Sequence, residues 1–444
     1  DVAPSRGLGD VYKRQQQYYS ATNDERIITF MTKYFRYQLN TLPQKPLGHW
    51  SFWAEFRACD NLQAVYWLYN LTGEAFLLEL GHLLHQQSYS FVDMVNRGDL
   101  RRICTIHCVN LAQGIKEPII YYQQDTNPKY IDAVKRGFQD IRQFHGQPQG
   151  MYGGDEALHG NNPTQGSELC AAVELMYSLE KMVEITGDID FADHLERIAF
   201  NALPTQISDD FMTKQYFQQP NQIMVTRHRR NFDQDHEGTD ITFGTLTGYP
   251  CCFSNMHQGW PKFTQHLWYA TPDNGIAAFS YSPSEVTAKV GNNVSVVISE
   301  DTYYPMDNRI SFTIKEVKNK TKQVEFPLHL RIPKWCKRAE IIVNGKAEQY
   351  IEGGRIAVIN RIWKRNDNVE LHLPMEVSTS TWYENAVTIE RGPLVYALKI
   401  KENWKKENLN NSWYGPHYYQ VTSSEPWNYG SVSYTHLRAH ATEL

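Results

Sequence analysis

Apolar and polar residues alternate at helical spacing through the first part of the chain, up to about residue 268. Four stretches open with a polar turn and an acidic residue and continue with apolar residues three and four positions apart, as capped amphipathic helices do. They begin at Asn23, Gly73, Asn127 and Gly187, so their starts lie 50, 54 and 60 residues apart. Further helical stretches lie between them: "CDNLQAVYWLYNLTG", "CTIHCVNLAQGIKEPIIYYQQ" and "ELCAAVELMYSLEKMVEITG". A repeated helix pair predicts stacked helical hairpins, in either a solenoid or a closed toroid.

The pattern changes to period two beyond Tyr269. Short runs of alternating apolar and polar residues follow one another, separated by turns rich in Asn, Gly and Lys: "NVSVVISEDTYY", "RISFTIKEV", "VEFPLHLRIP", "AEIIVNG", "RIAVINRIW" and "NVELHLPMEV". Strands at this spacing predict an antiparallel β-sandwich. We therefore expect a helical domain over residues 16–268 and a β-sandwich over residues 269–430.

The two ends fit neither pattern. "DVAPSRGLGDVYKRQ" (residues 1–15) and "SVSYTHLRAHATEL" (residues 431–444) resemble translated linker sequence, and we expect neither to pack into a domain. The chain then represents an internal fragment without an initiator Met, so the lack of a signal peptide gives no information on its compartment. The cytoplasm or periplasm of a bacterium is the expectation.

Composition narrows the class of protein. With 41% hydrophobic and 21% charged residues, the chain is an ordinary globular protein. No apolar run approaches the ~20 residues of a membrane span, and a net charge of −5 without a basic block argues against nucleic acid as a partner. Aromatic residues make up 13%, which is typical of proteins that stack sugars and also of large helical cores.

Cysteine supplies the first candidate chemistry. The seven cysteines are an odd number at irregular spacing, which favours reduced thiols over a disulfide framework. Cys251 and Cys252 are adjacent in "GYPCCFSN", and Glu168 and Cys170 lie in "GSELCAAVELM". If residues 168–170 are extended as they enter a helix, Glu168 and Cys170 point the same way. One carboxylate and three thiols are a donor set that suits tetrahedral zinc.

Each piece of this set also has a plainer interpretation. Cys170 precedes "AAVELM" and suits a buried face of a helix, where reduced cysteine is common. Cys251 and Cys252 could form a disulfide between neighbours. Neither Glu-x-Cys nor Cys-Cys has the spacing of a zinc finger.

The motifs together resemble glycoside hydrolase family 127, the retaining β-L-arabinofuranosidases. The likeness rests on "GGDEALHG", "SELCAAVELMYSLEKMVEITGD", "AFNALPTQI", the Cys-Cys-x-x-Asn of Cys251–Asn255, "LRIPKW" and "RGPLVYAL". It implies an (α/α)6-type helical toroid followed by β-sandwich modules. Since only four helix-pair repeats are visible, it also implies that about the first third of the toroid is missing at the N-terminus.

The resemblance assigns roles to residues. It implies a zinc ion held by Glu168, Cys170, Cys251 and Cys252, with Cys251 as the nucleophile. A thiolate is the reactive form of cysteine, and zinc keeps sulfur deprotonated at neutral pH. The resemblance also implies a glutamate upstream of the zinc glutamate as general acid/base, and the candidate is Glu156, although its gap of 12 residues to Glu168 is tighter than the family pattern. Its neighbour Asp155 is the alternative, and a pair of solvated loop charges is the plainer interpretation of both.

Four further residues are candidates for binding the carbohydrate substrate. His107 matches a family position where a histidine faces the sugar, although a histidine satisfied within the core fits as well. His159 lies in the acid/base loop, and Asp60 and Asn61 lie in "RACDNLQAV". Phe253 and Ser254 stand where the family has two prolines, which suggests a distinct subgroup.

The resemblance implies a retaining glycosidase that removes a terminal β-L-arabinofuranosyl-like sugar from plant-type glycans. Two alternatives stay open. A polysaccharide lyase of toroid-plus-sandwich architecture would use Arg227, Arg229 and Arg230 to hold uronates. A glycan-binding protein with a structural zinc would bind sugar without cleaving it.

Overall fold

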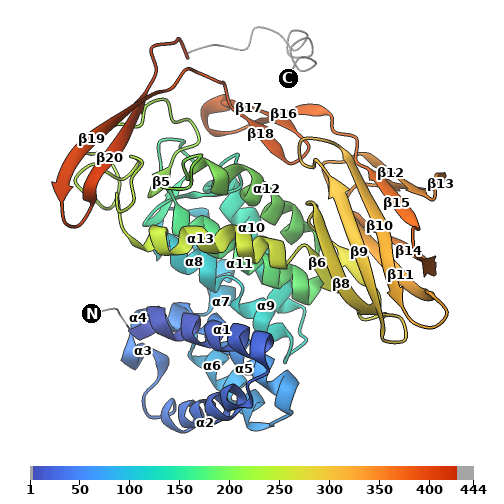
Figure 1. Ribbon diagram of the computed structural model, residues 1–444. Helices are drawn as coiled ribbons and strands as arrows, with labels where there is room; N and C mark the ends of the chain where they lie inside the picture. The colour runs from blue at the N-terminus through green and yellow to red at the C-terminus, as the bar shows by residue number, and fades with distance from the viewer. Residues whose placement is uncertain (1–3, 428–444) are drawn as a thin grey trace. The chain divides into compact units, whose positions relative to one another are not determined.

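The computed structural model describes residues 4–427, with side chains from residue 13 onward (Figure 1). The expectation for residues 431–444 therefore lies outside the described residues, as does that for residues 1–3. Contacts within the chain divide it into two compact units. Unit 1 contains the residues up to Gly146, Tyr152–Ile185 and Phe232–Gln234, and unit 2 contains Gln147–Met151, Thr186–Asn231 and the residues from Asp235 onward.

Unit 1 is mainly helical, as the apolar periodicity predicts. Its helices are α1 (Pro4–Thr22), α2 (Glu25–Thr41), α3 (Leu47–Trp50), α4 (Phe52–Phe56), α5 (Ala58–Thr72), α6 (Phe76–Gln87), α7 (Phe91–Asn96), α8 (Cys108–Gly114), α9 (Glu117–Tyr122), α10 (Lys129–Phe144) and α11 (Leu169–Thr186), with a 3₁₀ turn at Asp99–Arg101. Helices α2, α6 and α10 begin within three residues of the predicted repeat starts. An apolar core joins α2, α5, α6 and α9, and it includes Met31, Phe35, Leu62, Leu77 and Ile120.

One stretch of unit 1 predicted as helix begins as a strand. The residues "CTIH" form β1 (Cys104–His107), which pairs antiparallel with β3 (Ala157–Gly160) before α8 begins at Cys108. β-Branched residues at positions 105 and 106 favour the extended chain. The strands β2 (Gly153–Asp155) and β4 (Ser167–Glu168) continue this small sheet in the order β1-β3-β2-β4.

Helix α1 crosses the expected boundary at residue 15. The Lys13 ammonium lies 3.3 Å from the buried Asp60 carboxylate and over the ring of Tyr177. The expectation that residues 1–15 stay clear of any domain is therefore wrong at Lys13. The reason is electrostatic, because a buried carboxylate is strongly stabilised by a nearby cation. The foreign origin of residues 1–15 stays a prediction.

Unit 2 contains helices α12 (Ile189–Thr205) and α13 (Cys251–Gln265), the 3₁₀ turn at Tyr383–Asn385, and a long series of strands. The strands are β5 (Phe217–Gln218), β6 (Trp268–Ala270), β7 (Ile276–Ala278), β8 (Ser284–Val290), β9 (Val294–Thr302), β10 (Arg309–Lys318), β11 (Gln323–Ile332), β12 (Arg338–Val343), β13 (Lys346–Glu352), β14 (Arg355–Lys364), β15 (Asn368–His372), β16 (Val377–Thr381), β17 (Val387–Arg391), β18 (Leu394–Tyr396), β19 (Asn403–Asn411) and β20 (Gly415–Thr422). All six segments predicted from period-two alternation are strands. The order of helices first and sheets second is confirmed.

Two sheets of unit 2 bury one apolar core between them, in the yellow and orange part of Figure 1. One has the strand order β13-β12-β15-β10-β9-β8 and the other β14-β11-β7-β6. Alternate residues of β10 and β11 enter this core, among them Phe312 and Phe326. The expectation of purely antiparallel pairing is wrong at β7, which pairs parallel with β11. All three β7 residues are buried, so that strand carries no alternation from which its pairing could be predicted.

Arg331 of the "LRIPKW" motif is completely buried in unit 2. Its guanidinium binds the carboxylates of Asp193 and Glu196 on α12, at 2.7 Å for Glu196, and the Tyr304 hydroxyl donates to Glu196 at 2.5 Å. A buried guanidinium is tolerated where several charged acceptors meet it. This network fixes α12 to the strand β11.

Glu300 on β9 makes the stability of the β-sheet region depend on pH. It is 3% exposed, and burial raises the pKa of its carboxyl group to about 8, although Ser282 N–H and Ser284 Oγ–H donate to it. In the unfolded chain a glutamate titrates near its ordinary pKa of about 4.3. Between these values only the unfolded state releases its proton, so the free energy of unfolding falls as pH rises.

We expect Glu300→Gln, which mimics the protonated acid, to flatten this dependence. The free energy of unfolding of the wild type should fall by up to about 1.4 kcal/mol per pH unit from this group between pH 5 and 8. Urea denaturation across that range measures the slope. Glu348→Gln, at an exposed position on β13, is the control and should keep the wild-type slope. Equal slopes in both variants would contradict the assignment to Glu300.

Candidate active site and metal centre

A one-residue turn presents Glu156. Strands β2 and β3 pair Asp155 directly with Ala157, so Glu156 alone makes the connection, with a left-handed φ of 84°. The Cys108 N–H donates to the Glu156 carbonyl at 2.7 Å and holds the turn. A Cβ added at Gly153 would lie 2.1 Å from the Gly160 carbonyl oxygen, so this hairpin can close only around a glycine.

His107 faces the Glu156 side chain. Its Nδ1 accepts hydrogen bonds from the amides of Val109 and Asn110, so His107 caps α8 and its proton resides on Nε2. That Nε2 lies 3.1 Å from Glu156 Oε2. The edge of Trp53 packs against the imidazole at a ring distance of 5.0 Å. A neutral His107 therefore donates to the Glu156 carboxylate from a ring whose orientation is fixed.

Glu168 and Cys170 lie where β4 becomes α11. The chain is extended up to Glu168, as expected, but the helix already begins at Leu169, so Cys170 occupies its first turn. Both side chains are buried. The Cys108 thiol donates to Glu168 Oε2 at 3.5 Å. Unpaired amides at a helix N-terminus favour negative charge, which suits a thiolate at Cys170.

Cys251 and Cys252 open helix α13, directly after Pro250. The preceding Gly248 has a φ of 67°, and a Cβ there would lie 2.1 Å from the Cβ of Tyr216, so a larger residue cannot occupy this position without displacing the chain. The buried Lys214 ammonium also donates to the carbonyls of Thr247 and Tyr249. The cysteine pair thus enters its helix from a fixed turn, and the helix N-terminus favours thiolates here too.

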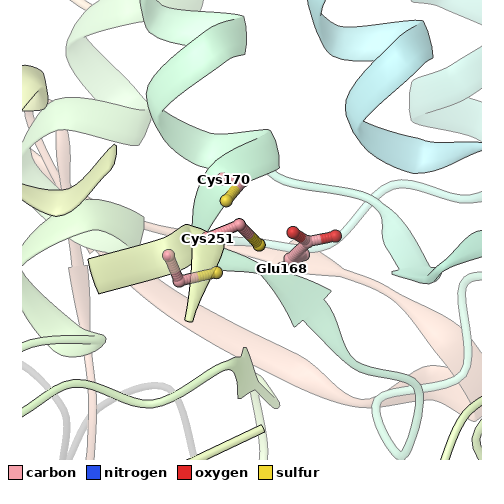
Figure 2. Close-up of side chains that lie close together, drawn as sticks. Glu168, Cys170 and Cys251 are labelled. Carbon is pink, nitrogen blue, oxygen red and sulfur yellow. The ribbon is translucent and has the colours of Figure 1, made fainter. Parts of the chain in front are cut away.

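The ligand atoms of Glu168, Cys170, Cys251 and Cys252 all lie within 4.8 Å of one another. Figure 2 shows the sulfurs of Cys170 and Cys251 beside the Glu168 carboxylate. Three sulfurs and one carboxylate oxygen are the number and kind of donors that zinc takes in a tetrahedral site, so the residues fit the ion that the sequence predicts. Cys251 is the partly exposed residue of the four, and the other three are buried.

Glu168 also belongs to a second group, with His107 and Glu156. Two carboxylates and one imidazole could hold a harder cation, but the thiol group offers more donors of the soft kind that zinc favours. If Glu168 serves the thiol group, His107 and Glu156 remain beside it for other chemistry. A possible metal-binding cluster thus adjoins a hydrogen-bonded His–Glu pair.

The predicted substrate residues Asp60 and Asn61 contact other side chains of unit 1, and their role toward a substrate stays a prediction. Although burial alone would raise it, Lys116 and Lys13 hold the pKa of Asp60 below its ordinary value. The Lys116 ammonium lies 3.1 Å from Asp60 Oδ1 and is itself fully buried. Asn61 Nδ2 donates to Gln38 at 3.0 Å. Both side chains serve contacts among helices.

His159 lies between two carboxylates. Its Nδ1 is 3.0 Å from Asp155 Oδ1, and its Nε2 is 3.0 Å from Asp233 Oδ2. Asp155 is completely buried, and burial raises the pKa of its carboxyl group to about 7 against the opposing effect of His159. Asp155 therefore faces His159, whereas Glu156 faces His107 and Glu168.

Three residues of the site were not predicted from the sequence. Cys108 follows His107 directly and could have been noticed as a further thiol beside a candidate residue. Trp53 lies four residues before "RACDNLQAV" and Asp233 three residues after Arg230, but nothing in either stretch of sequence indicates a contact with His107 or His159.

The arginines that a lyase would need are paired within their own loop in unit 2. Arg227 binds the backbone and the carboxylate of Glu237, and Arg229 lies 3.4 Å from Asp235. Arg230 donates to the carbonyls of Thr226 and His228. These contacts account for the basic stretch without a uronate ligand.

The described residues also bear on two expectations from composition. All seven cysteines lie among them and none forms a disulfide. Over the same part of the chain, every helix is too short or too polar to cross a bilayer.

Comparisons with known proteins point to one family. The sequence model of a domain described as "Beta-L-arabinofuranosidase, GH127 catalytic domain" matches residues 8–265, and that of the GH127 middle domain matches residues 275–375. A curated relative, the non-reducing end β-L-arabinofuranosidase of Bifidobacterium longum subsp. longum, is 25% identical over 253 residues. The match covers 54% of this chain and 37% of the relative, so the chain spans little more than a third of the relative's length.

Solved structures share the fold. A GH127 β-L-arabinofuranosidase from Geobacillus stearothermophilus T6 matches with a TM-score of 0.70 at 19% identity, over 98% of this chain and 75% of that one. A second GH127 β-arabinofuranosidase matches with a TM-score of 0.66 at 19% identity, over 94% and 70% of the two chains. At these identities the likeness concerns the fold alone.

The cluster predicts a bound ion that depends on its thiols. We expect the purified chain to carry about one zinc, and Cys170→Ala to lower zinc affinity by at least about 100-fold, since a buried ligand is lost. Elemental analysis after dialysis against a zinc buffer measures both. Cys104→Ala removes a half-buried thiol outside the cluster and should retain the wild-type zinc content. Full zinc content in Cys170→Ala would exclude this residue as a ligand.

Proposed function

The chain belongs to glycoside hydrolase family 127, and from this membership we infer that it is a retaining glycosidase acting on a terminal β-L-arabinofuranosyl-like sugar of plant-type glycans. The observation that carries the proposal is the match of the catalytic domain over residues 8–265, which contains Glu156 and the Glu/Cys cluster. The substrate is accordingly a carbohydrate.

Cys251 is the proposed nucleophile, and Glu168, Cys170, Cys251 and Cys252 are the proposed zinc ligands. Bound there, zinc would keep the Cys251 sulfur in its thiolate form. Cys251 suits this role because it is the more accessible member of the adjacent pair and begins α13, where backbone amides favour an anion. Cys170 and Cys252 are buried and suit the role of ligand alone.

Glu156 is the proposed general acid and base. A retaining glycosidase needs one group that protonates the leaving oxygen and later deprotonates water. Glu156 lies at a turn with its carboxylate beside His107 and Glu168, whereas Asp155 is buried against His159. This difference in direction favours Glu156 over its neighbour.

The proposed reaction has two steps. The Cys251 sulfur attacks the anomeric carbon and forms a carbon–sulfur bond, while Glu156 gives its proton to the departing oxygen. Glu156 then takes a proton from water, whose oxygen displaces the Cys251 sulfur and restores the thiolate. His107 orients Glu156 through its Nε2 proton, and its expected place beside the sugar is part of the same proposal.

The finer architecture is part of the same proposal. We assign residues 16–268 to an (α/α)6-type toroid and residues 269–430 to a β-sandwich. The catalytic and middle domain matches end and begin on either side of this boundary, and two sheets share the core of the second part.

Two variants distinguish nucleophile from acid/base. Cys251→Ser should lower kcat/KM on every substrate by at least about 10³-fold, including nitrophenyl glycosides, because an alcohol of high pKa replaces the sulfur. Glu156→Gln should leave kcat/KM on a nitrophenyl L-arabinofuranoside within about tenfold, because that leaving group needs little protonation, and lower it on unactivated glycans by about 10²–10⁴-fold. Steady-state kinetics on the two substrate classes measure both.

Azide provides the control for the second variant. It attacks the glycosyl intermediate without needing a base, so it should restore turnover of nitrophenyl substrate in Glu156→Gln but leave Cys251→Ser inactive. Unchanged cleavage of natural glycans by Glu156→Gln would show that another group is the acid.

A further inference from the structure

The proposed mechanism does not use the contacts that His159 makes with Asp155 and Asp233. Both ring nitrogens contact carboxylate oxygens, Nδ1 that of Asp155 and Nε2 that of Asp233, each at 3.0 Å. The imidazole is 20% exposed, Asp155 is fully buried and Asp233 is 41% exposed. The ring thus links a buried carboxylate to one nearer the surface, and no ring nitrogen remains for a sugar hydroxyl.

Asp155 immediately precedes Glu156, so whatever holds Asp155 also holds the turn. The turn needs such support, because a residue other than glycine at a φ of 84° costs about 1–3 kcal/mol. On one side the Cys108 N–H and His107 restrain Glu156. On the other side His159, itself on β3 of the same hairpin, restrains Asp155.

Asp233 brings in a separate part of the chain. It belongs to the short segment Phe232–Gln234, which packs with unit 1 although the residues on either side of it pack with unit 2. The Asp233 contact with His159 ties this segment to the hairpin. Because the residues on both sides of Phe232–Gln234 belong to unit 2, we expect the contact with His159 to determine where this segment lies in unit 1.

We propose that His159 is a positioning residue that, through Asp155 and Asp233 together, fixes the one-residue turn on which Glu156 is presented. The inference rests on the proposed role of Glu156 as acid/base. His159 touches neither the sugar nor the reacting atoms. Asp233 acts on the turn through its contact with His159. If either contact is lost, the Glu156 carboxylate no longer points in the direction in which it donates its proton.

Kinetics with two leaving groups test the proposal. His159→Phe keeps a ring but no donor, and Asp233→Ala removes the outer carboxylate. In both, kcat/KM on an unactivated arabinofuranosyl disaccharide should fall about 10–100-fold, a part of the full general-acid contribution, while kcat/KM on the nitrophenyl glycoside stays within about threefold. Asp233→Asn keeps an acceptor oxygen and should recover most of the loss.

Asp235→Ala is the matched control. Asp235 lies two residues from Asp233 and contacts Arg229 and the Gly238 amide, both outside the β2–β3 hairpin. It should leave both kcat/KM values within about threefold of wild type. If the role of His159 is purely structural, His159→Phe lowers kcat/KM on both substrates equally, and that result overturns the proposal.

A second measurement does not depend on activity. The Cys108 amide donates to the Glu156 carbonyl, so its hydrogen exchange reports the state of the turn. Exchange should accelerate at least about tenfold in His159→Phe and Asp233→Ala and stay unchanged in Asp235→Ala. Unchanged exchange in the first two variants refutes the positioning role.

The outcomes separate this inference from the proposed function. If Glu156→Gln shows the leaving-group dependence and His159→Phe does not, the positioning role fails and the acid/base assignment stands. If Glu156→Gln lacks the dependence, the acid/base assignment fails. Faster exchange at Cys108 in His159→Phe would then still establish the mechanical link to the turn.

Discussion

The accumulation of negative charge around Glu168 is the constraint on which the rest of the site depends. The Glu168 carboxylate lies within 4.8 Å of the sulfurs of Cys170, Cys251 and Cys252, and within the same distance of ligand atoms of Glu156 and His107. Like charges at such distances repel one another strongly in a medium of low dielectric constant. The helix N-termini at Cys170 and Cys251 and the Nε2 proton of His107 offset part of that repulsion, and the zinc ion proposed above would offset more of it.

The same constraint accounts for the arrangement of the two neighbouring carboxylates. Asp155 and Glu156 lie side by side in sequence, yet each has its own histidine, His159 for one and His107 for the other. Because the turn between β2 and β3 consists of Glu156 alone, the two side chains diverge. Divergence gives them separate environments, and such separation is how paired carboxylates acquire different protonation behaviour.

Much of the fold could be predicted from sequence because its signals are local. The helical spacing of apolar residues predicted the positions of α2, α6 and α10. The alternation of apolar and polar residues predicted those of β9–β12, β14 and β15. The Glu168, Cys170, Cys251 and Cys252 grouping required the family resemblance, since Cys-Cys and Glu-x-Cys are weak motifs alone. Contacts set by tertiary pairing escaped prediction. Ile106 looked helical but joins a strand, Asp60 looked available but meets Lys116, and Asp233 contacts His159 across 74 residues of chain.

The one-residue turn at Glu156 leaves this hairpin no tolerance for a change of length. Inserting or deleting a residue there would reverse the alternation of β2 or β3, so that an Asp155 side chain would point where Glu156 now points. The segment at residues 161–166 is different, because it only has to return the chain to the parallel pairing of Gly154 with Ser167. Evolution and protein engineers alike could therefore vary the length of that segment while the Glu156 side chain keeps its place beside His107.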